Sequence, residues 1–214
     1  MNSKTKVKRS PKRGLYDIEN IKTILDKDFT CHIGFIHDNY PVVIPTLYGR
    51  LNNHIYIHGA TSSRMLKSIE GNNTSVTITL VNGLVLARSA FHHSLNYESV
   101  VLFGKPKLVF DDEKLLGLKV ISDQMLKGRW EDCSPPNNKE LKATSVLKLE
   151  INEASAKIRN GAPSDDAEDY KLNYWAGELP IKRLFEKPIA DETGIKNIAI
   201  PNYIQNQLNQ GCDE

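Results

Sequence analysis

Hydrophobic and polar residues alternate with a period of two along much of this chain, and the alternation predicts β-strands. In residues 29–35 the hydrophobic side chains alternate with Thr30, His32 and Gly34, and Asp38-Asn39 then supplies a turn. The dipeptide Asn82-Gly83 predicts a hairpin between two later strands. Strands are expected over residues 29–35, 41–48, 54–58, 74–80, 84–89, 97–103, 105–110, 145–151 and 155–159.

Helical spacing of hydrophobic residues marks three shorter stretches. Residues 17–27 follow Asp17, which can cap a helix, and residues 62–70 lie between a serine cap and Gly71. A third helix, from residue 111 to about residue 127, begins with three acids, as the helix dipole favours. The pattern as a whole predicts a meander of antiparallel strands with flanking helices.

Pro45 falls inside the strand predicted over residues 41–48. Because proline cannot donate a hydrogen bond to a neighbouring strand, we expect it at an edge, a bulge or a place where something else is the neighbour. A flat aromatic ligand would suit such a gap, and an ordinary edge proline is the alternative.

The helix predicted over residues 62–70 carries its charges in the unfavourable order. Arg64 and Lys67 fall in its first turns, and Glu70 falls in its last turn. A phosphate at the N-terminus, held by Arg64, by the hydroxyl groups of Thr61, Ser62 and Ser63 and by free N–H groups, would explain this order. A simple cap with exposed basic residues remains the alternative.

A polar segment leads into the hydrophobic strand predicted over residues 97–103. Buried polar groups need hydrogen-bond partners, and a bound ligand is one way to supply them. The segment contains Arg88, Ser89, His92, His93, Ser94 and Asn96.

Two motifs identify a family resemblance that runs from about Arg13 to Pro180. The motifs are Ala-Arg-Ser-Ala-Phe-His-His-Ser-Leu-Asn-Tyr-Glu-Ser-Val-Val-Leu-Phe-Gly at 87–104 and Ile-His-Gly-Ala-Thr-Ser-Ser-Arg at 57–64. Both resemble the pyridoxamine 5'-phosphate oxidase-related flavin-nucleotide-binding proteins, in particular their nitroimidazole-resistance-like branch. Segments 154–159 and 174–180 also match. The resemblance implies a mainly β, FMN-binding split β-barrel with flanking helices, about six to eight antiparallel strands and a homodimer with the flavin between subunits.

The resemblance also assigns site residues. It places the edge of the isoalloxazine ring against the backbone of residues 43–46 and the FMN phosphate at the start of helix 62–70. His93 is a candidate catalytic residue. The expected cofactor-binding residues are Val43, Ile44, Pro45, Thr46, His58, Gly59, Ser62, Ser63, Arg64, Lys67, Asn96, Ser99 and Trp175.

The charge of the chain is nearly balanced, with 28 basic and 26 acidic residues and a net charge of +2. This balance gives no reason to expect a nucleic-acid-binding protein. Six basic residues cluster within residues 4–13, which we interpret as part of a flexible arm over residues 1–13. A nucleic-acid or membrane contact is the alternative, although no aromatic or hydrophobic face accompanies these charges. The arm would precede a domain over residues 14–180 and a loosely held extension over residues 181–214.

The cysteine and histidine patterns favour neither disulfides nor a metal site. Three widely spaced cysteines form no CxxC pair, which fits a reducing cytoplasm, and no signal peptide or membrane-spanning run is expected. The adjacent pair His92-His93 would point to opposite sides of an extended chain, so no metal site is predicted.

Three functions stay open. The first is an FMN-dependent oxidoreductase that passes electrons between NADH or NADPH and a small molecule. The second is a haem-binding split barrel, with His92 or His93 as axial ligand. The third is a non-catalytic flavin-binding protein. The arginine- and histidine-containing C-terminal pattern by which pyridoxamine phosphate oxidases hold their substrate has no counterpart here, so that reaction is not expected.

Overall fold

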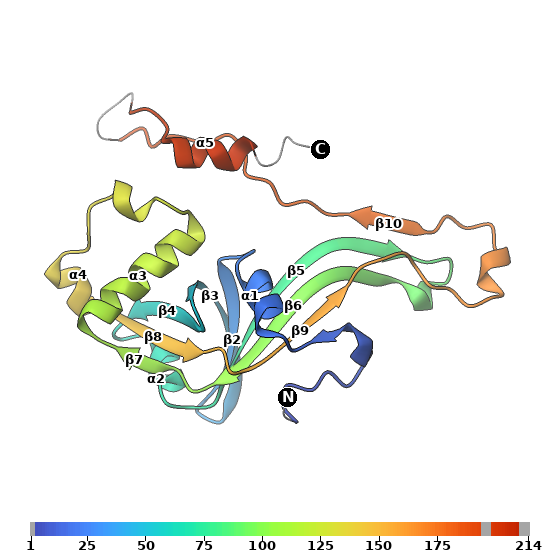
Figure 1. Cartoon of the computed structure of the whole chain (residues 1–214), viewed down its shortest axis with the longest axis horizontal. Coiled ribbons are helices and arrows are strands. Elements are labelled where there is room, and N and C mark those ends of the chain that lie inside the picture. The colour runs from blue at the N-terminus through green and yellow to red at the C-terminus, as the bar shows by residue number, and fades with distance from the viewer. Residues whose placement is uncertain (1–2, 194–197, 210–214) are drawn as a thin grey trace.

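The computed structural model describes residues 3–193 and 198–209 (Figure 1). Ten described strands form one antiparallel sheet, nine of them in the order β1-β9-β6-β5-β2-β3-β4-β8-β7. The tenth, β10, pairs with residues 83–86 of β5, whereas β2 pairs with residues 75–77 of the same strand. The strands are β1 (Gly14–Leu15), β2 (Thr30–His37), β3 (Tyr40–Leu51), β4 (His54–Ala60), β5 (Thr74–Leu86), β6 (Ser94–Gly104), β7 (Lys107–Val109), β8 (Thr144–Glu150), β9 (Glu153–Arg159) and β10 (Gly177–Pro180).

Five α-helices and four short 3-10 helices accompany the described sheet. Asp17 caps the first helix by accepting hydrogen bonds from Glu19 N and Asn20 N, as predicted. The short helices over residues 138–143 and 202–209 were not predicted. The α-helices are α1 (Ile18–Leu25), α2 (Arg64–Ile69), α3 (Asp111–Met125), α4 (Asn138–Ala143) and α5 (Asn202–Asn209), and the 3-10 helices are η1 (Pro11–Arg13), η2 (Ala90–His92), η3 (Trp130–Asp132) and η4 (Asp169–Lys171).

The sheet bends around one hydrophobic core because alternate residues of its strands are apolar. Ile33, Ile57, Ile78 and Leu102 come from four strands and are fully buried there. β3 connects the two halves of the sheet, since its residues up to Leu47 pair with β2 and those from Tyr48 pair with β4. The chain also changes halves at Pro106, where β7 pairs with β8 instead of continuing β6.

α3 lies against β3, β4 and β8, and a glycine in β3 permits the contact (Figure 1). A Cβ atom on Gly49 would lie 2.5 Å from the backbone of Val120 in α3, which is closer than atoms can approach. The helix backbone therefore packs directly on the strand. Tyr56, Val109, Ile121 and Val146 form a second, smaller core beneath the helix.

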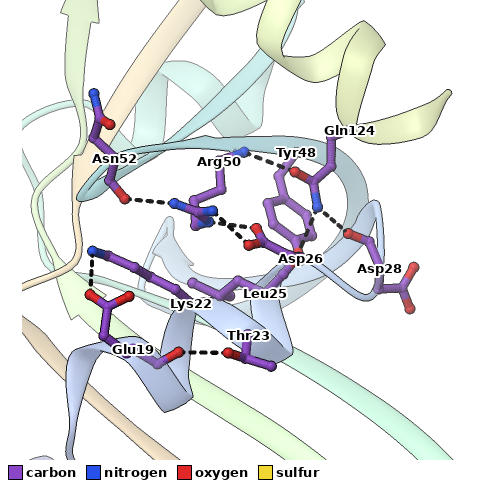
Figure 2. Close-up of polar contacts among 10 residues, drawn as sticks. All are labelled: Glu19, Lys22, Thr23, Leu25, Asp26, Asp28, Tyr48, Arg50, Asn52 and Gln124. Atoms are coloured by element: carbon purple, nitrogen blue, oxygen red, sulfur yellow. Dashed lines mark hydrogen bonds and ion pairs between the residues drawn. The ribbon is translucent and has the colours of Figure 1, made fainter. Parts of the chain in front are cut away.

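A polar cluster joins the end of α1 to β3 and α3 (Figure 2). Gln124 of α3 donates to the carbonyl oxygens of Leu25 and Asp28 at 2.9 and 2.7 Å. Its own side-chain oxygen accepts from Arg50 N, while the Arg50 guanidinium pairs with Asp26. The cluster satisfies the carbonyl groups where α1 ends, which fixes the loop after this helix.

The predicted hairpin at Asn82-Gly83 is wrong, because β5 continues through both residues. A register shift between Val81 and Gly83 marks a bulge in the pairing with β6. A Cβ atom on Gly83 would lie 2.9 Å from the carbonyl oxygen of Leu179 in β10. Gly83 therefore allows β10, which is distant in sequence, to approach β5 closely. Glycine occurs both at such close contacts and in turns, so the Asn-Gly pair alone did not distinguish them.

The two ends of the chain contact the sheet in different ways. Where a flexible arm was expected, the described residues of segment 3–13 include the buried Thr5 and an ion pair between Lys4 and Glu153 of β9. The expected extension is attached through the pairing of β10 with β5 and ends in α5, apart from residues 194–197 and 210–214, which lie outside the described part. Within the described residues, no helix is both long and apolar enough to cross a membrane.

Candidate functional site

The predicted edge position of Pro45 is confirmed. Residues 40–47 of β3 pair with β2 on one side, and pairing with β4 on the other side begins only at Tyr48. Among the described strands, none covers the second edge of residues 40–47. Backbone N–H and C=O groups at that edge are available to a ligand.

The four site residues predicted on β3 are divided between its two faces. Val43 and Pro45 are exposed, with Val43 65% accessible, whereas Ile44 packs against the core and Thr46 is half-buried. A flat ligand on this strand would therefore contact the Val43 and Pro45 side chains and the open backbone edge.

Gly59 brings the end of β4 against α2. A Cβ atom there would lie 3.1 Å from the Leu66 side chain, and Ser63 caps α2 by accepting from Leu66 N at 3.4 Å. Gly71 follows the helix with a φ of +68°, the left-handed conformation expected after a helix end. His37 and Ser68, 2.9 Å apart, tie α2 to β2. These contacts fix the position of the predicted phosphate-binding residues.

The expected charge order of this helix is only partly correct. α2 has six residues, so Lys67 lies in its last turn and Arg64 is the basic residue of its first turn. Ser62, Arg64 and Lys67 are exposed, and neither base has an ion pair with another described residue. The dipole argument is weaker than predicted, and two exposed, unpaired cations remain beside a serine.

His58 lies beneath α3, on the opposite face of β4 from the main core. Ile55 and Ile57 enter the main core, so Tyr56 and His58 point toward the helix. His58 Nδ1 is buried and has no hydrogen-bond partner among the described residues. Burial lowers the pKa of the imidazole, because water no longer stabilises its charged form. The ring is therefore a neutral imidazole near pH 7.

A cavity of about 390 Å³ at the end of α1 is lined in part by Arg183, and another, of about 370 Å³, borders His58. The second, here the His58 cavity, is mainly apolar. Sequence reasoning did not identify it, because its walls come from distant segments. It is lined by Leu47, His58, Leu118, Ile121, Ser122, Met125, Trp130, Ser134, Pro136, Glu140 and Thr144.

The polar segment before residue 97 finds partners within the chain. His93 is exposed, and its Nδ1 accepts from Ala87 N at 3.0 Å. Asp165 is enclosed and accepts from Arg88 N, Ser89 N and the Arg88 guanidinium, which together lower the pKa of its carboxyl group although burial opposes them. Three of the six polar residues that suggested a ligand, Arg88, Ser89 and His92, thus contact the loop after β9.

The remaining predicted residues lie on the side of the sheet formed by β6, β9 and β10. Asn96 is buried, donates to Glu178 of β10 at 2.5 Å and accepts from the Arg159 guanidinium. Ser99 donates to the Lys157 carbonyl oxygen at 3.4 Å, and Trp175 is 69% exposed. β5 and β2 separate this group from β3, so one chain does not bring the two groups together.

One surface group has the composition of a metal site. His92, Asp166 and Asp169 place ligand atoms within 4.8 Å of one another, and His92 pairs with Asp166 at 3.3 Å. The sequence analysis considered only the adjacent histidines and missed this group, since the acids follow 74 residues or more later. The ion pair alone accounts for the proximity of His92 and Asp166.

Comparison with known structures extends the similarity to nearly the whole chain. The flavocytochrome Anf3 from Azotobacter vinelandii is 36% identical, with a TM-score of 0.91 over 96% of this chain and 97% of that chain. The FAD and heme binding protein from Mycobacterium smegmatis is 29% identical, with a TM-score of 0.87 over 92% and 97% of the two chains. A Bacteroides thetaiotaomicron structure assigned to 5-nitroimidazole antibiotic resistance, 22% identical, shares the fold with a TM-score of 0.57 over 68% and 86%.

These similarities confirm the predicted fold class, a mainly β split barrel with flanking helices, although the described sheet has ten strands and not six to eight. The additional strands are short ones at the sheet edges and β10 of the extension. A comparison with curated protein sequences gave no match. The family model described as pyridoxamine 5'-phosphate oxidase matches residues 17–158, and the chain belongs to this family.

Proposed function

We propose that this protein binds a flavin nucleotide and haem and uses them to transfer electrons. The observation that carries the proposal is the 36% identity, over nearly the whole chain, to a protein described as a flavocytochrome. A second relative, described as binding FAD and heme, supports it over 92% of the chain. Two of the functions predicted from sequence as alternatives, a flavoprotein and a haem protein, are thereby combined.

The flavin is proposed to lie along the open edge of β3. The unpaired edge of residues 40–47 offers backbone hydrogen bonds, and Val43 and Pro45 offer an apolar surface to the ring. The phosphate would be bound by Ser62, Arg64 and Lys67, whose side chains are exposed. An arginine and a lysine without ion pairs to described residues are well suited to a phosphate group.

FMN is the flavin predicted from the sequence, and one relative is described as binding FAD. The two nucleotides share riboflavin 5'-phosphate, which is the part that the β3 edge and Arg64 would hold. We retain FMN as the minimal ligand. Mass spectrometry of the flavin released by heat separates the two nucleotides by the AMP group of FAD.

A homodimer would complete the flavin site. Gly34, Val43, Ser75 and Phe103 are cross-strand neighbours on the outer face of the sheet, where they line a shallow, mainly apolar hollow. Ile36 and Tyr40 beside them are exposed apolar residues. Such a surface favours association with a second copy. A second subunit could then bring Ser99 and Trp175 to the flavin, which one chain does not do, whereas Asn96 is buried and paired within its own chain.

We propose that the His58 cavity is the haem-binding site. Its walls are mainly apolar, and His58 offers a neutral imidazole whose Nδ1 lacks a hydrogen-bond partner among the described residues. We propose His58 as the axial ligand, in place of His92 or His93. Haem, when bound, would accept and donate single electrons. Leu47, Trp130 and Met125 would exclude water from its apolar faces.

The donor and acceptor are proposed only by class. A nicotinamide nucleotide is the proposed donor and a small molecule the acceptor. Oxidation of pyridoxamine phosphate is not proposed, because the C-terminal substrate-binding pattern is absent from the sequence.

A visible absorption spectrum tests the proposal. Protein purified after expression with riboflavin and a haem precursor should show flavin bands and a Soret band. When NADH or NADPH is added without oxygen, the flavin bands should bleach and the Soret band should shift to longer wavelength as the haem iron is reduced. His58→Ala should lose the Soret band and retain the flavin bands. A wild-type protein that binds neither cofactor, even after reconstitution, would refute the proposal.

A further inference from the structure

The outer wall of the His58 cavity is the loop between α3 and α4, residues 126–137. Trp130, Ser134 and Pro136 of this loop line the cavity. Residues 131–135 are all exposed, so the loop has little packing of its own. A cavity wall of this kind depends on contacts from neighbouring segments for its position.

α3 holds the inner side of the loop. Lys119 pairs with Glu131, and Gly128 N donates to Asp123 Oδ1 at 3.4 Å. Lys119 also lies 3.4 Å from Asp123, so one lysine joins both acids. These contacts are largely exposed ion pairs, which are weak individually.

α5 of the C-terminal extension contacts the outer side of the loop through Tyr203. Its hydroxyl group donates to Asp132 Oδ2 at 2.8 Å and accepts from Arg129 Nη1 at 3.3 Å. Its ring faces Gly128, where an added Cβ atom would lie 3.6 Å from the ring. Gly128 has a φ of +92°, a conformation that other residues rarely adopt. The tyrosine therefore contacts the loop on both sides of Trp130 in sequence.

The extension reaches this position across a long, sparsely packed segment. After β10, Leu184, Phe185 and Ile189 are exposed, and Arg183 is tied to Asp28 at 3.2 Å. Figure 1 shows the chain leaving β10 and running toward the side of the molecule where α5 lies. The family model ends at residue 158, whereas a match covering 96% of the chain must include most of residues 181–209. The extension is thus common to this chain and the flavocytochrome.

We infer that Tyr203 is a positioning residue for the haem cavity, through which the C-terminal extension holds the loop that carries Trp130. This inference rests on the proposed haem function and adds a role for the extension. Tyr203 itself does not line the cavity. Loss of its hydroxyl group should free the loop, widen access to the haem and increase the rate of haem release.

The experiment compares haem release from the full-length protein and its variants. Each protein is loaded with hemin, and transfer of the haem to excess apomyoglobin is followed in the Soret region. Tyr203→Phe keeps the ring on Gly128 and removes both hydrogen bonds. We expect haem release to be about tenfold faster. This factor corresponds to the free energy lost with one or two hydrogen bonds to charged groups. Tyr174→Phe, at an exposed tyrosine in the loop before β10, is the matched control and should behave as wild type.

A double-mutant cycle separates positioning from general destabilisation. Asp132→Ala, which removes the acceptor of the Tyr203 hydroxyl group, should also accelerate release. The double variant should release haem more slowly than the two single effects added together, because both changes remove the hydrogen bond between Tyr203 and Asp132. The melting temperature of the apoprotein and the flavin affinity should be unchanged. Equal release rates for Tyr203→Phe and wild type would overturn the inference, as would additive effects in the cycle. If wild type takes up no hemin, the proposed haem function fails as well, which distinguishes the two results.

Discussion

The hydroxyl group of Tyr48 donates a 2.5 Å hydrogen bond to the carbonyl oxygen of Leu25, and both residues are fully buried (Figure 2). Burial raises the pKa of Tyr48 well above its ordinary value, so the hydroxyl group remains a donor. The bond joins the last residue of α1 to β3, at the point where pairing passes from β2 to β4. It therefore links the first helix to both halves of the sheet.

Replacing Tyr48 by Phe should destabilise the protein moderately. The Leu25 carbonyl group retains the hydrogen bond from Gln124, so no buried acceptor is left unpaired. We expect a loss of about 0.5–1.5 kcal/mol in the free energy of unfolding, measured with urea. Tyr174→Phe, at an exposed tyrosine, should change it by less than about 0.5 kcal/mol. A loss at position 48 no larger than at position 174 would contradict the importance of this bond.

Arg64→Glu should weaken FMN binding and leave the fold intact. A charge-assisted hydrogen bond contributes about 1.5–3 kcal/mol, or roughly one to two orders of magnitude in Kd, and the introduced carboxylate adds repulsion. Apoproteins of wild type and variant are titrated with FMN and with riboflavin, which lacks the phosphate.

Wild type should prefer FMN over riboflavin, and the variant should lose that preference while binding riboflavin equally well. Arg9→Glu, at another exposed arginine, controls for net charge. Retention of FMN within a factor of about three of wild type would place the phosphate elsewhere.

His58 should make the stability of the apoprotein depend on pH. Its pKa in the folded state lies below the ordinary value of 6.5, so the unfolded chain takes up the proton first on acidification. The stabilisation from a neutral, buried His58 is complete above pH 6.5 and is lost as the pH falls through the lower, folded-state pKa. Urea unfolding from pH 7.5 to about 5 measures this dependence.

In His58→Gln, which cannot titrate, the free energy of unfolding should fall less steeply below pH 6.5 than in wild type. The difference between the two slopes isolates His58 from the acidic residues that also titrate. Parallel curves for the two proteins would mean that His58 is not shielded from water in solution.

His93→Ala should reduce electron transfer from the nicotinamide donor more than it reduces stability. The side chain is exposed, so its removal leaves no cavity in the core. Its only hydrogen bond to a described residue is from Ala87 N. The measurements are the rate of flavin reduction by NADH or NADPH and the melting temperature. If both fall together, His93 holds the loop after β5 and has no role in turnover.

The sequence by itself determined most of the strands, the first three helices and the family. Strand alternation, the Asp17 cap and the acidic start of α3 are local signals, and each produced the predicted element because neighbouring residues decide its energy. The motifs at 57–64 and 87–104 identified the family before any contact was known. The missing N–H group of Pro45 predicted an edge, a bulge or a neighbour other than a strand, and the structure shows the edge.

Only the tertiary structure decided which polar groups are free. Asn96 and Arg88 are polar residues beside a hydrophobic strand, as ligand-binding residues can be. Their side chains instead donate hydrogen bonds to Glu178 and Asp165, about 80 residues away in sequence. Gly83 signals a turn locally, and the close approach of β10 explains it instead. His58 was predicted to bind the flavin. It lines an apolar cavity instead, because α3 and the loop after it cover this side of β4. Such pairings are decided by packing between distant segments, which no local pattern encodes.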